Sequence, residues 1–232
     1  MITSILTMFN PFVLFASIKQ LLGHIAIFFR YSESIPGIEE HSNNIAYRLP
    51  FDGEWTVLNG NVEKEHSHSW FLYTQRYAYD FVITDENGRT HRVSGISNED
   101  HYCFGKPIYA PGDGIVIEMR TSHHDAPRPG GSLDILQKDL RGNYVIIDNG
   151  HEFSVIAHLA YNSVTVNVGD VVKQGTLIGY CGNSETLQNH ISIFIFRIIQ
   201  SSSWEWVYLS YLSQLRFILL KLILPCSKKK AT

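Results

Sequence analysis

Two side chains of types that bind metals and transfer protons, His68 and Asp80, lie within the length of one hairpin. Asp80 stands in the run 77–83, where aromatic, small and β-branched residues alternate as in a half-buried or fully buried strand. A carboxylate inside such a strand is costly unless a cation, a metal or hydrogen-bond donors lie beside it. Histidine and aspartate are both common ligands of zinc. These residues alone leave two interpretations open: a metal site, or an aspartate that Arg76 or backbone donors satisfy.

The region that must position these residues, 46–200, is rich in β-like sequence. Its apolar runs are short, regularly spaced and separated by turn residues, with no long helical pattern between them. The pattern predicts an all-β domain with antiparallel strands. The loop Thr121–Gly131 is rich in Pro, Gly, Asp and His, and its pair His123 and His124 is interpreted as solvated rather than metal-binding. The expected strands are Glu54–Leu58, 77–83, Ile115–Ile117, Asn143–Asp148, Phe153–Leu159, Val164–Val168 and Leu177–Cys181.

Composition sets broad limits on function. A chain of 232 residues can bury one good core and carry a small extra segment at either end. The formal net charge of −3 and the isoelectric point of about 6.4 give no indication of nucleic-acid binding. Three widely spaced cysteines predict neither a disulfide framework nor a CxxC zinc site. Eleven histidines are many, which favours a metal or acid–base site without locating it.

The two ends of the chain are apolar and stand apart from the β-rich region. Residues 1–45 are expected to form a helix and a linker, without the basic region and cleavage site of a secretory signal peptide. We expect this helix to lie on a membrane surface or on the domain, with a single-span anchor as the rival interpretation. Residues 201–232 form an apolar tail, irregular or helical, that ends in three lysines followed by Ala and Thr.

Six motifs along the chain occur in a characteristic order over residues 50–195. They are SHSW…QRYAYDFVI, PIYAPGDGIVIEM, RGNYVIIDNG, VIAHL, VNVGDVVKQGTLIGYCGNS and NHIS. In this order they resemble the lysostaphin-like (LytM-type) zinc endopeptidases, family twenty-three of the metallopeptidases. The resemblance implies a β-sheet, barrel-sandwich-hybrid domain with a groove, one zinc ion, and hydrolysis of peptide bonds in peptidoglycan cross-bridges. It also implies a bacterial protein of the cell envelope or the membrane.

The resemblance assigns the first two zinc ligands to the stretch described above. His68 matches the first ligand and Asp80 the second. His66 is a rival for the first position, because the segment between ligand and aspartate is long in this sequence.

The remaining positions of the motif fall on His158, His190 and Ser192. His158 matches a histidine that lines the groove, and His190 matches the first histidine of the family's H-x-H motif. The second histidine of that motif is the third zinc ligand, and here that position is Ser192. A neutral hydroxyl is a poor replacement for imidazole at zinc. Moving His190 into the ligand position would need a two-residue register shift, so we expect an impaired metal site.

In an intact site of this kind, zinc lowers the pKa of a bound water toward about 7. The resemblance then implies that His158 and His190 act as general base and as donors to the developing oxyanion.

Two functions from different classes remain open. One is a zinc endopeptidase whose metal site is weakened. The other is a metal-free, non-catalytic module, or pseudoenzyme, that binds cell-wall peptides or a protein partner. A change of reading frame near Ser192 is a further hypothesis, because a shifted frame can spell His-Phe-His-Phe-Gln-Asp-Asn-Pro and restores a histidine at the ligand position.

Overall fold

The computed structural model describes residues 18, 45–61, 63–67, 69–70, 77–129, 141–150 and 152–184, together with the backbone of 193–199. The N-terminal apolar segment, apart from Ile18, and the tail 201–232 lie outside these residues. None of the helices in the described ranges is long and apolar enough to cross a membrane.

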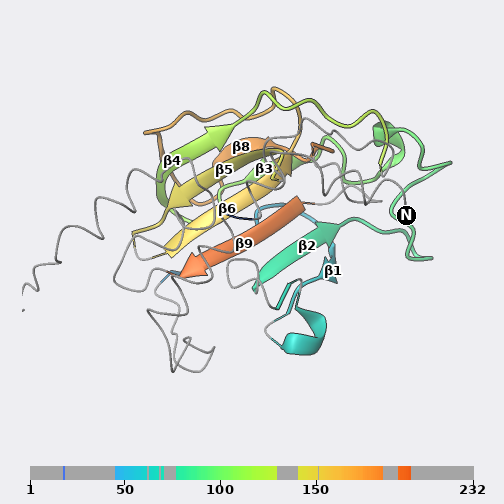
Figure 1. Cartoon of the computed structure of the whole chain (residues 1–232), viewed down its shortest axis with the longest axis horizontal. Coiled ribbons are helices and arrows are strands. Elements are labelled where there is room, and N and C mark those ends of the chain that lie inside the picture. The colour runs from blue at the N-terminus through green and yellow to red at the C-terminus, as the bar shows by residue number, and fades with distance from the viewer. Residues whose placement is uncertain are drawn as a thin grey trace, which may run out of the picture.

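The regular elements of the described chain are strands with almost no helix, as the sequence predicts (Figure 1). Seven strands form one sheet in the order β1-β2-β9-β6-β5-β4-β7, and β3 and β8 form a second, two-stranded sheet. Every strand pair is antiparallel. The strands are β1 (Thr56–Asn59), β2 (Ala78–Val82), β3 (Pro107–Tyr109), β4 (Gly114–Arg120), β5 (Asn143–Asp148), β6 (Glu152–Leu159), β7 (Val171–Val172), β8 (Leu177–Tyr180) and β9 (Ile193–Ile199), with short 3-10 turns η2 (Lys64–His66) and η3 (Asn98–Asp100).

The central strands β5 and β6 are buried on both faces, which explains their nearly continuous apolar sequence. Val145 and Ile147 of β5 belong to one apolar cluster, whereas Tyr144 and Ile146 belong to another. Because successive side chains of a strand point to opposite faces, the two clusters lie on opposite faces of the sheet. The small sheet contributes Ile108 to the first cluster, so β3 and β8 pack on that face.

Strand β9 lies between β2 and β6 in the sheet. In the sequence, 33 residues separate it from the end of β6 and 110 separate it from the end of β2. Figure 1 shows β4, β5, β6, β9 and β2 following one another across the sheet in that order. The strand β9 therefore joins the β1–β2 pair to the rest of the sheet.

The expected strands differ from the structure at Val164–Val168, and they do not include β3, β7 or β9. Val164–Val168 is not a strand: its Thr165 amide donates to the Ile178 carbonyl at 3.1 Å, but no ladder forms. The chain passes through turns on both sides of this segment, at Tyr161–Asn162 and at Val168–Gly169, and these turns leave no room for an extended pairing. A short strand that was not predicted as such, β7, follows instead and pairs with the start of β4.

Candidate active site

Asp80 lies in the middle of β2, and its side chain is fully buried. Its Oδ2 accepts a hydrogen bond from Asn59 Nδ2 at 3.0 Å, and Asn59 is its pairing partner on β1. The sequence predicts a buried strand carboxylate with a compensating group beside it, and the structure supplies an amide donor in that role. Arg76, the alternative partner, lies outside the described residues.

The backbone of β9 connects Asp80 with the strand that ends at His158. Phe194 pairs with Asp80 on one side and with Ala157 on the other. Residues directly opposite one another in an antiparallel sheet point to the same face, so Asp80 and Ala157 share a face two strands apart, about 10 Å. Ala157 immediately precedes His158. Strand β9, which begins directly after Ser192 in the sequence, thus lies between the strands that carry Asp80 and His158.

His158 occupies a bulge in β6. Asn143 pairs with Leu159 and Tyr144 pairs with Ala157, which leaves His158 as the extra residue between them. Its φ of 63° is in the left-handed region, where a side chain with a Cβ is disfavoured. Bulges and left-handed residues of this kind re-aim side chains and concentrate at functional sites. No sequence signal for the bulge exists, because the left-handed position carries histidine rather than glycine.

Two backbone hydrogen bonds hold the bulge in place. The His158 amide donates to the Arg141 carbonyl at 3.2 Å, and the His158 carbonyl accepts from the Gly182 amide at 2.9 Å. The His158 residue is 5% exposed, so the backbone at the bulge has little access to water. The second bond ties the bulge to the loop that follows β8.

Ser184 anchors the end of that loop to β5 and β6. Its hydroxyl accepts from the Asn143 amide at 2.9 Å and donates to the Leu159 carbonyl at 2.8 Å. Both bonds are buried, and they satisfy backbone groups that the bulge removes from the ladder. A Cβ at Gly142, whose φ is 63°, would overlap Ser184, so glycine is required at that position.

Asp125 fixes the middle of the same loop. Its Oδ1 accepts from the Asn183 amide at 2.7 Å, and its Oδ2 accepts from the Tyr161 amide at 2.9 Å. The Asn183 side chain donates in turn to Asn98 Oδ1 at 2.8 Å. The loop 181–184, which precedes His190 in the sequence, is therefore held by Asp125, by Asn98 and by the bonds of Ser184. The sequence carries no signal for this role of Asp125 or Asn183, because a lone aspartate in a Pro- and Gly-rich loop is typical of a solvated position.

The other candidate residues are less well placed or lie outside the described part of the chain. His68, His190 and Ser192 are not among the described residues. The rival ligand His66 is exposed on η2. His124 stacks on Tyr161 with ring centroids 3.9 Å apart. In the ranges given above, no three His, Cys, Asp or Glu residues form a group that could hold a metal ion.

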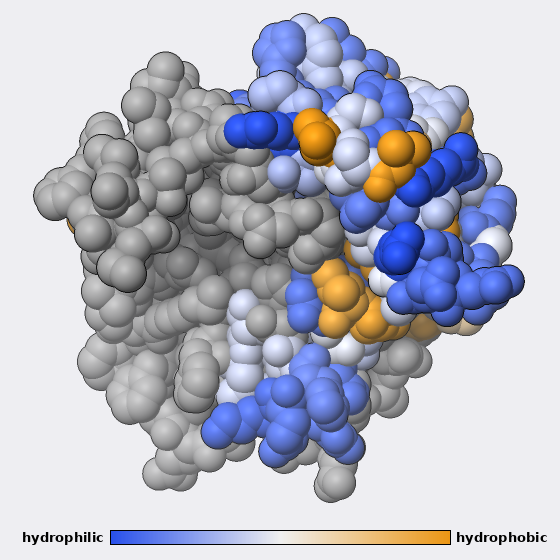
Figure 2. Space-filling view, turned by 90° about the vertical axis from the view of Figure 1, so that its right-hand side faces the viewer, coloured by the Kyte–Doolittle hydropathy of each residue, from blue (hydrophilic) through white to orange (hydrophobic). Residues whose placement is uncertain are grey.

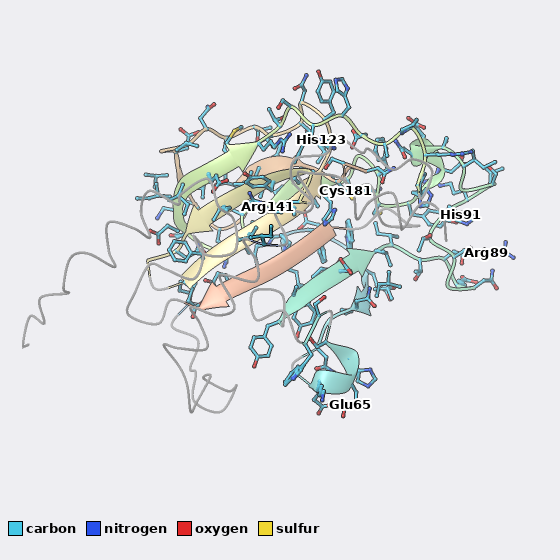
Figure 3. All side chains as sticks on the ribbon, viewed as in Figure 1. Glu65, Arg89, His91, His123, Arg141 and Cys181 are labelled. Carbon is cyan, nitrogen blue, oxygen red and sulfur yellow. The ribbon has the colours of Figure 1, made fainter. Side chains whose placement is uncertain are left out.

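Figure 3 shows how the labelled residues lie around this region. His123, Arg141 and Cys181 lie toward the middle of the molecule, whereas Arg89 and Glu65 lie at its edges. Arg141 is buried, contacts the Tyr144 ring at 3.6 Å from the centroid, and forms an ion pair with Glu118 at 3.4 Å. This ion pair and ring contact fix the start of β5 next to the carbonyl that holds His158.

Comparison with known proteins gives a family match over part of the chain. Residues 94–202 match the sequence model of peptidase family M23. Over these residues the resemblance read from the motifs is confirmed. No curated protein sequence matches the chain.

Solved structures of several peptidases are similar to the chain at low sequence identity. A zinc-containing peptidase from Vibrio cholerae is 20% identical, with 67% of this chain and 37% of that one covered and a TM-score of 0.42. The catalytic domain of a prophage-encoded M23 protein from Enterococcus faecalis is 15% identical, with 66% and 88% covered and a TM-score of 0.39. The catalytic domain of lysostaphin from Staphylococcus simulans is 18% identical, with 68% and 80% covered and a TM-score of 0.32. The chain thus spans little more than a third of the Vibrio protein's length.

Proposed function

We propose that this chain is a zinc endopeptidase-type domain, with a lysostaphin-like barrel-sandwich architecture, whose metal site is weakened at the third ligand. His68 and Asp80 are the proposed ligands that remain, and Ser192 occupies the third position. His158 and His190 are the proposed groove histidines, which would hold and transfer protons at the scissile peptide. Zinc, when bound, would supply Lewis-acid activation of water and of the substrate carbonyl.

One observation carries this proposal: β9 lies between the strand of Asp80 and the strand that ends at His158. Ser192 immediately precedes β9 in the sequence. The carboxylate of Asp80 is a suitable zinc ligand, and its hydrogen-bonding partner Asn59 is the type of group that orients a metal-bound carboxylate. The donor set therefore fits zinc at Asp80 and does not fit it at Ser192.

The proposed substrate is a peptide of the peptidoglycan cross-bridge, and the proposed location is the bacterial cell envelope or membrane. These two assignments rest on the family alone. The proposed contact with a membrane is through the N-terminal apolar segment.

The second candidate function is a metal-free module that binds cell-wall peptides or a protein partner. The serine at the ligand position favours it, because loss of one of three protein ligands removes most zinc affinity. On the face shown in Figure 2, the described residues are mostly hydrophilic, with apolar side chains only in small groups. Over that part of the surface a polar peptide is a better fit than a large apolar partner surface.

A zinc titration separates the two functions. We expect calorimetry to show weak zinc binding by the unmodified chain. Ser192→His should raise the zinc affinity by at least about 100-fold, because a residue that coordinates the metal directly contributes more affinity than the contacts that orient it. Asn87→His, which adds a histidine at an exposed turn, is the matched control and should change nothing. Tight, equimolar zinc in the unmodified chain would contradict the assignment of Ser192 and redirect attention to His66.

A further inference from the structure

Two cysteines far apart in the sequence, Cys103 and Cys181, meet in the core. Both are fully buried as free thiols and belong to the same apolar cluster. The Cys181 amide donates to the Lys106 carbonyl at 2.8 Å, and the Cys181 carbonyl accepts from the Gly105 amide at 2.8 Å. The Lys106 amide donates back to the Cys103 carbonyl at 3.1 Å and closes a tight turn over residues 103–106. This turn brings Cys103 close to Cys181.

The two thiols are also in direct contact. A hydrogen bond from the Cys181 side chain lowers the pKa of Cys103, although burial opposes this. Burial, together with the contact to Cys103, raises the pKa of Cys181 well above its ordinary value. A disulfide requires Cα atoms within about 7 Å and side chains that point toward each other. Thiols that hydrogen-bond to each other from adjoining backbone segments meet the second condition.

We infer that Cys103 and Cys181 form a disulfide when the chain folds under oxidising conditions. The bond would join the turn that follows η3 to the residue directly after β8. It would form during folding, because both sulfur atoms are inaccessible once the core has closed. The inference is independent of the proposed zinc site, since neither cysteine is among the proposed ligands.

The chemistry is thiol–disulfide exchange with a small disulfide such as oxidised glutathione. One cysteine thiolate attacks a glutathione sulfur, breaks the S–S bond and releases one glutathione thiolate. The second cysteine thiolate attacks the protein sulfur of the mixed disulfide and releases the second glutathione. The two cysteines lose two protons and two electrons in total, and one oxidised glutathione becomes two reduced molecules.

The position of Cys181 gives this bond a structural consequence. Cys181 forms an isolated β-bridge with Leu159, and the next residue, Gly182, donates to the His158 carbonyl. A disulfide at Cys181 would therefore restrain the loop that supports the His158 bulge.

The test refolds the full chain carrying Cys226→Ser, which leaves Cys103 and Cys181 as its two thiols. Refolding in a buffer of reduced and oxidised glutathione is followed by denaturation, alkylation and mass spectrometry. We expect no alkylation and a tryptic cross-link between peptides 93–120 and 174–197. The melting temperature should rise by about 5–15 °C relative to the same sample after reduction. The variant with both Cys103→Ser and Cys181→Ser should melt at the same temperature before and after reduction.

Two results would overturn the inference. One is a folded, oxidised sample, judged by circular dichroism, in which both cysteines are alkylated. The other is cross-linking that joins two molecules rather than two peptides of one molecule. If Cys226→Ser fails to fold, the same peptide map on the unmodified chain decides the matter, because a bond to Cys226 would appear as a different cross-link.

Discussion

The carbonyl of His158 accepts a hydrogen bond from the amide of Gly182 at 2.9 Å. This bond joins the bulge in β6 to the loop after β8, next to the bridge between Leu159 and Cys181 and the bond from the Ala160 amide to the Tyr180 carbonyl. The backbone at His158 is therefore held in an unfavourable conformation by bonds from its surroundings. Such strain is maintained when the neighbouring structure determines it more strongly than local preference does.

The first prediction concerns this strain. His158→Gly should give a protein about 1 kcal/mol more stable than His158→Ala, because glycine alone adopts φ of 63° without penalty. Both variants lack the imidazole, so their difference isolates the backbone term. Urea denaturation of the two variants measures it. Asn162→Gly, at φ 53° outside the site, is the control and should gain less over the native asparagine, since asparagine tolerates this conformation.

The second prediction concerns Asp80. In the Ser192→His background, Asp80→Ala should abolish zinc binding, whereas Asn59→Ala should weaken it by about 10–100-fold, as is typical for a group that orients a ligand. Calorimetry measures both. Unchanged zinc affinity in Asp80→Ala would remove this residue from the ligand set and return it to a structural role beside Asn59.

The third prediction concerns the anchor of the loop. Ser184→Ala should lower the free energy of unfolding by about 1–3 kcal/mol, because the buried Asn143 amide and Leu159 carbonyl both lose a partner. Ser94→Ala is a matched control: its hydroxyl also donates and accepts, to Asp100 and from Ile96, but it is exposed and water can replace it. Urea denaturation measures both variants. An equal loss of unfolding free energy in Ser184→Ala and Ser94→Ala would show that burial of the Ser184 hydrogen bonds does not add to their contribution.

The fourth prediction concerns pH. The hydrogen bond from Lys173 and then the amide of Gln174 lower the pKa of Asp113 from its ordinary value of 3.8. A lowered folded-state pKa stabilises the protein above the unfolded-state pKa, and this contribution is lost as the pH falls through the folded-state pKa. The melting temperature of Asp113→Asn should therefore fall less than that of the native chain between about pH 5 and about pH 2. Lys173→Met removes the larger of the two causes of the pKa shift. The pH dependence of its melting temperature should therefore lie between those of the native chain and Asp113→Asn.

The fifth prediction concerns the gene. If the reading frame changed near Ser192, the codons of Ser192, Phe194 and Phe196 each end in C and the codon of Arg197 is AGG. These bases give His, His, Gln and Asp in the shifted frame. Sequencing the coding DNA decides it, and any other base at those positions excludes the hypothesis.

The strands were predictable where alternation or continuous burial shaped the sequence. Asn143–Asp148 matches β5 and Phe153–Leu159 matches β6 to within one residue, because both lie between apolar clusters. Val164–Val168 has the same β-branched composition but lies between two turns, so composition alone was misleading there.

The candidate site was predictable only at the level of residue types. The burial of Asp80 followed from the apolar run around it, and the structure places it as expected. The bulge at His158, the anchor at Ser184 and the contact between Cys103 and Cys181 all depend on segments that are distant in sequence. No local pattern encodes such contacts, which arise only when the sheet has formed.

The place of β9 in the sheet also constrains how the protein can be made. Synthesis proceeds from the N-terminus, so β2 and β6 leave the ribosome well before the strand that must lie between them. Until residue 199 has emerged, each of these strands presents one open edge, and open edges pair readily with other chains. Nascent chains that stop short of β9 should therefore be the most aggregation-prone products of translation, and a chaperone that shields β-edges should act at this stage.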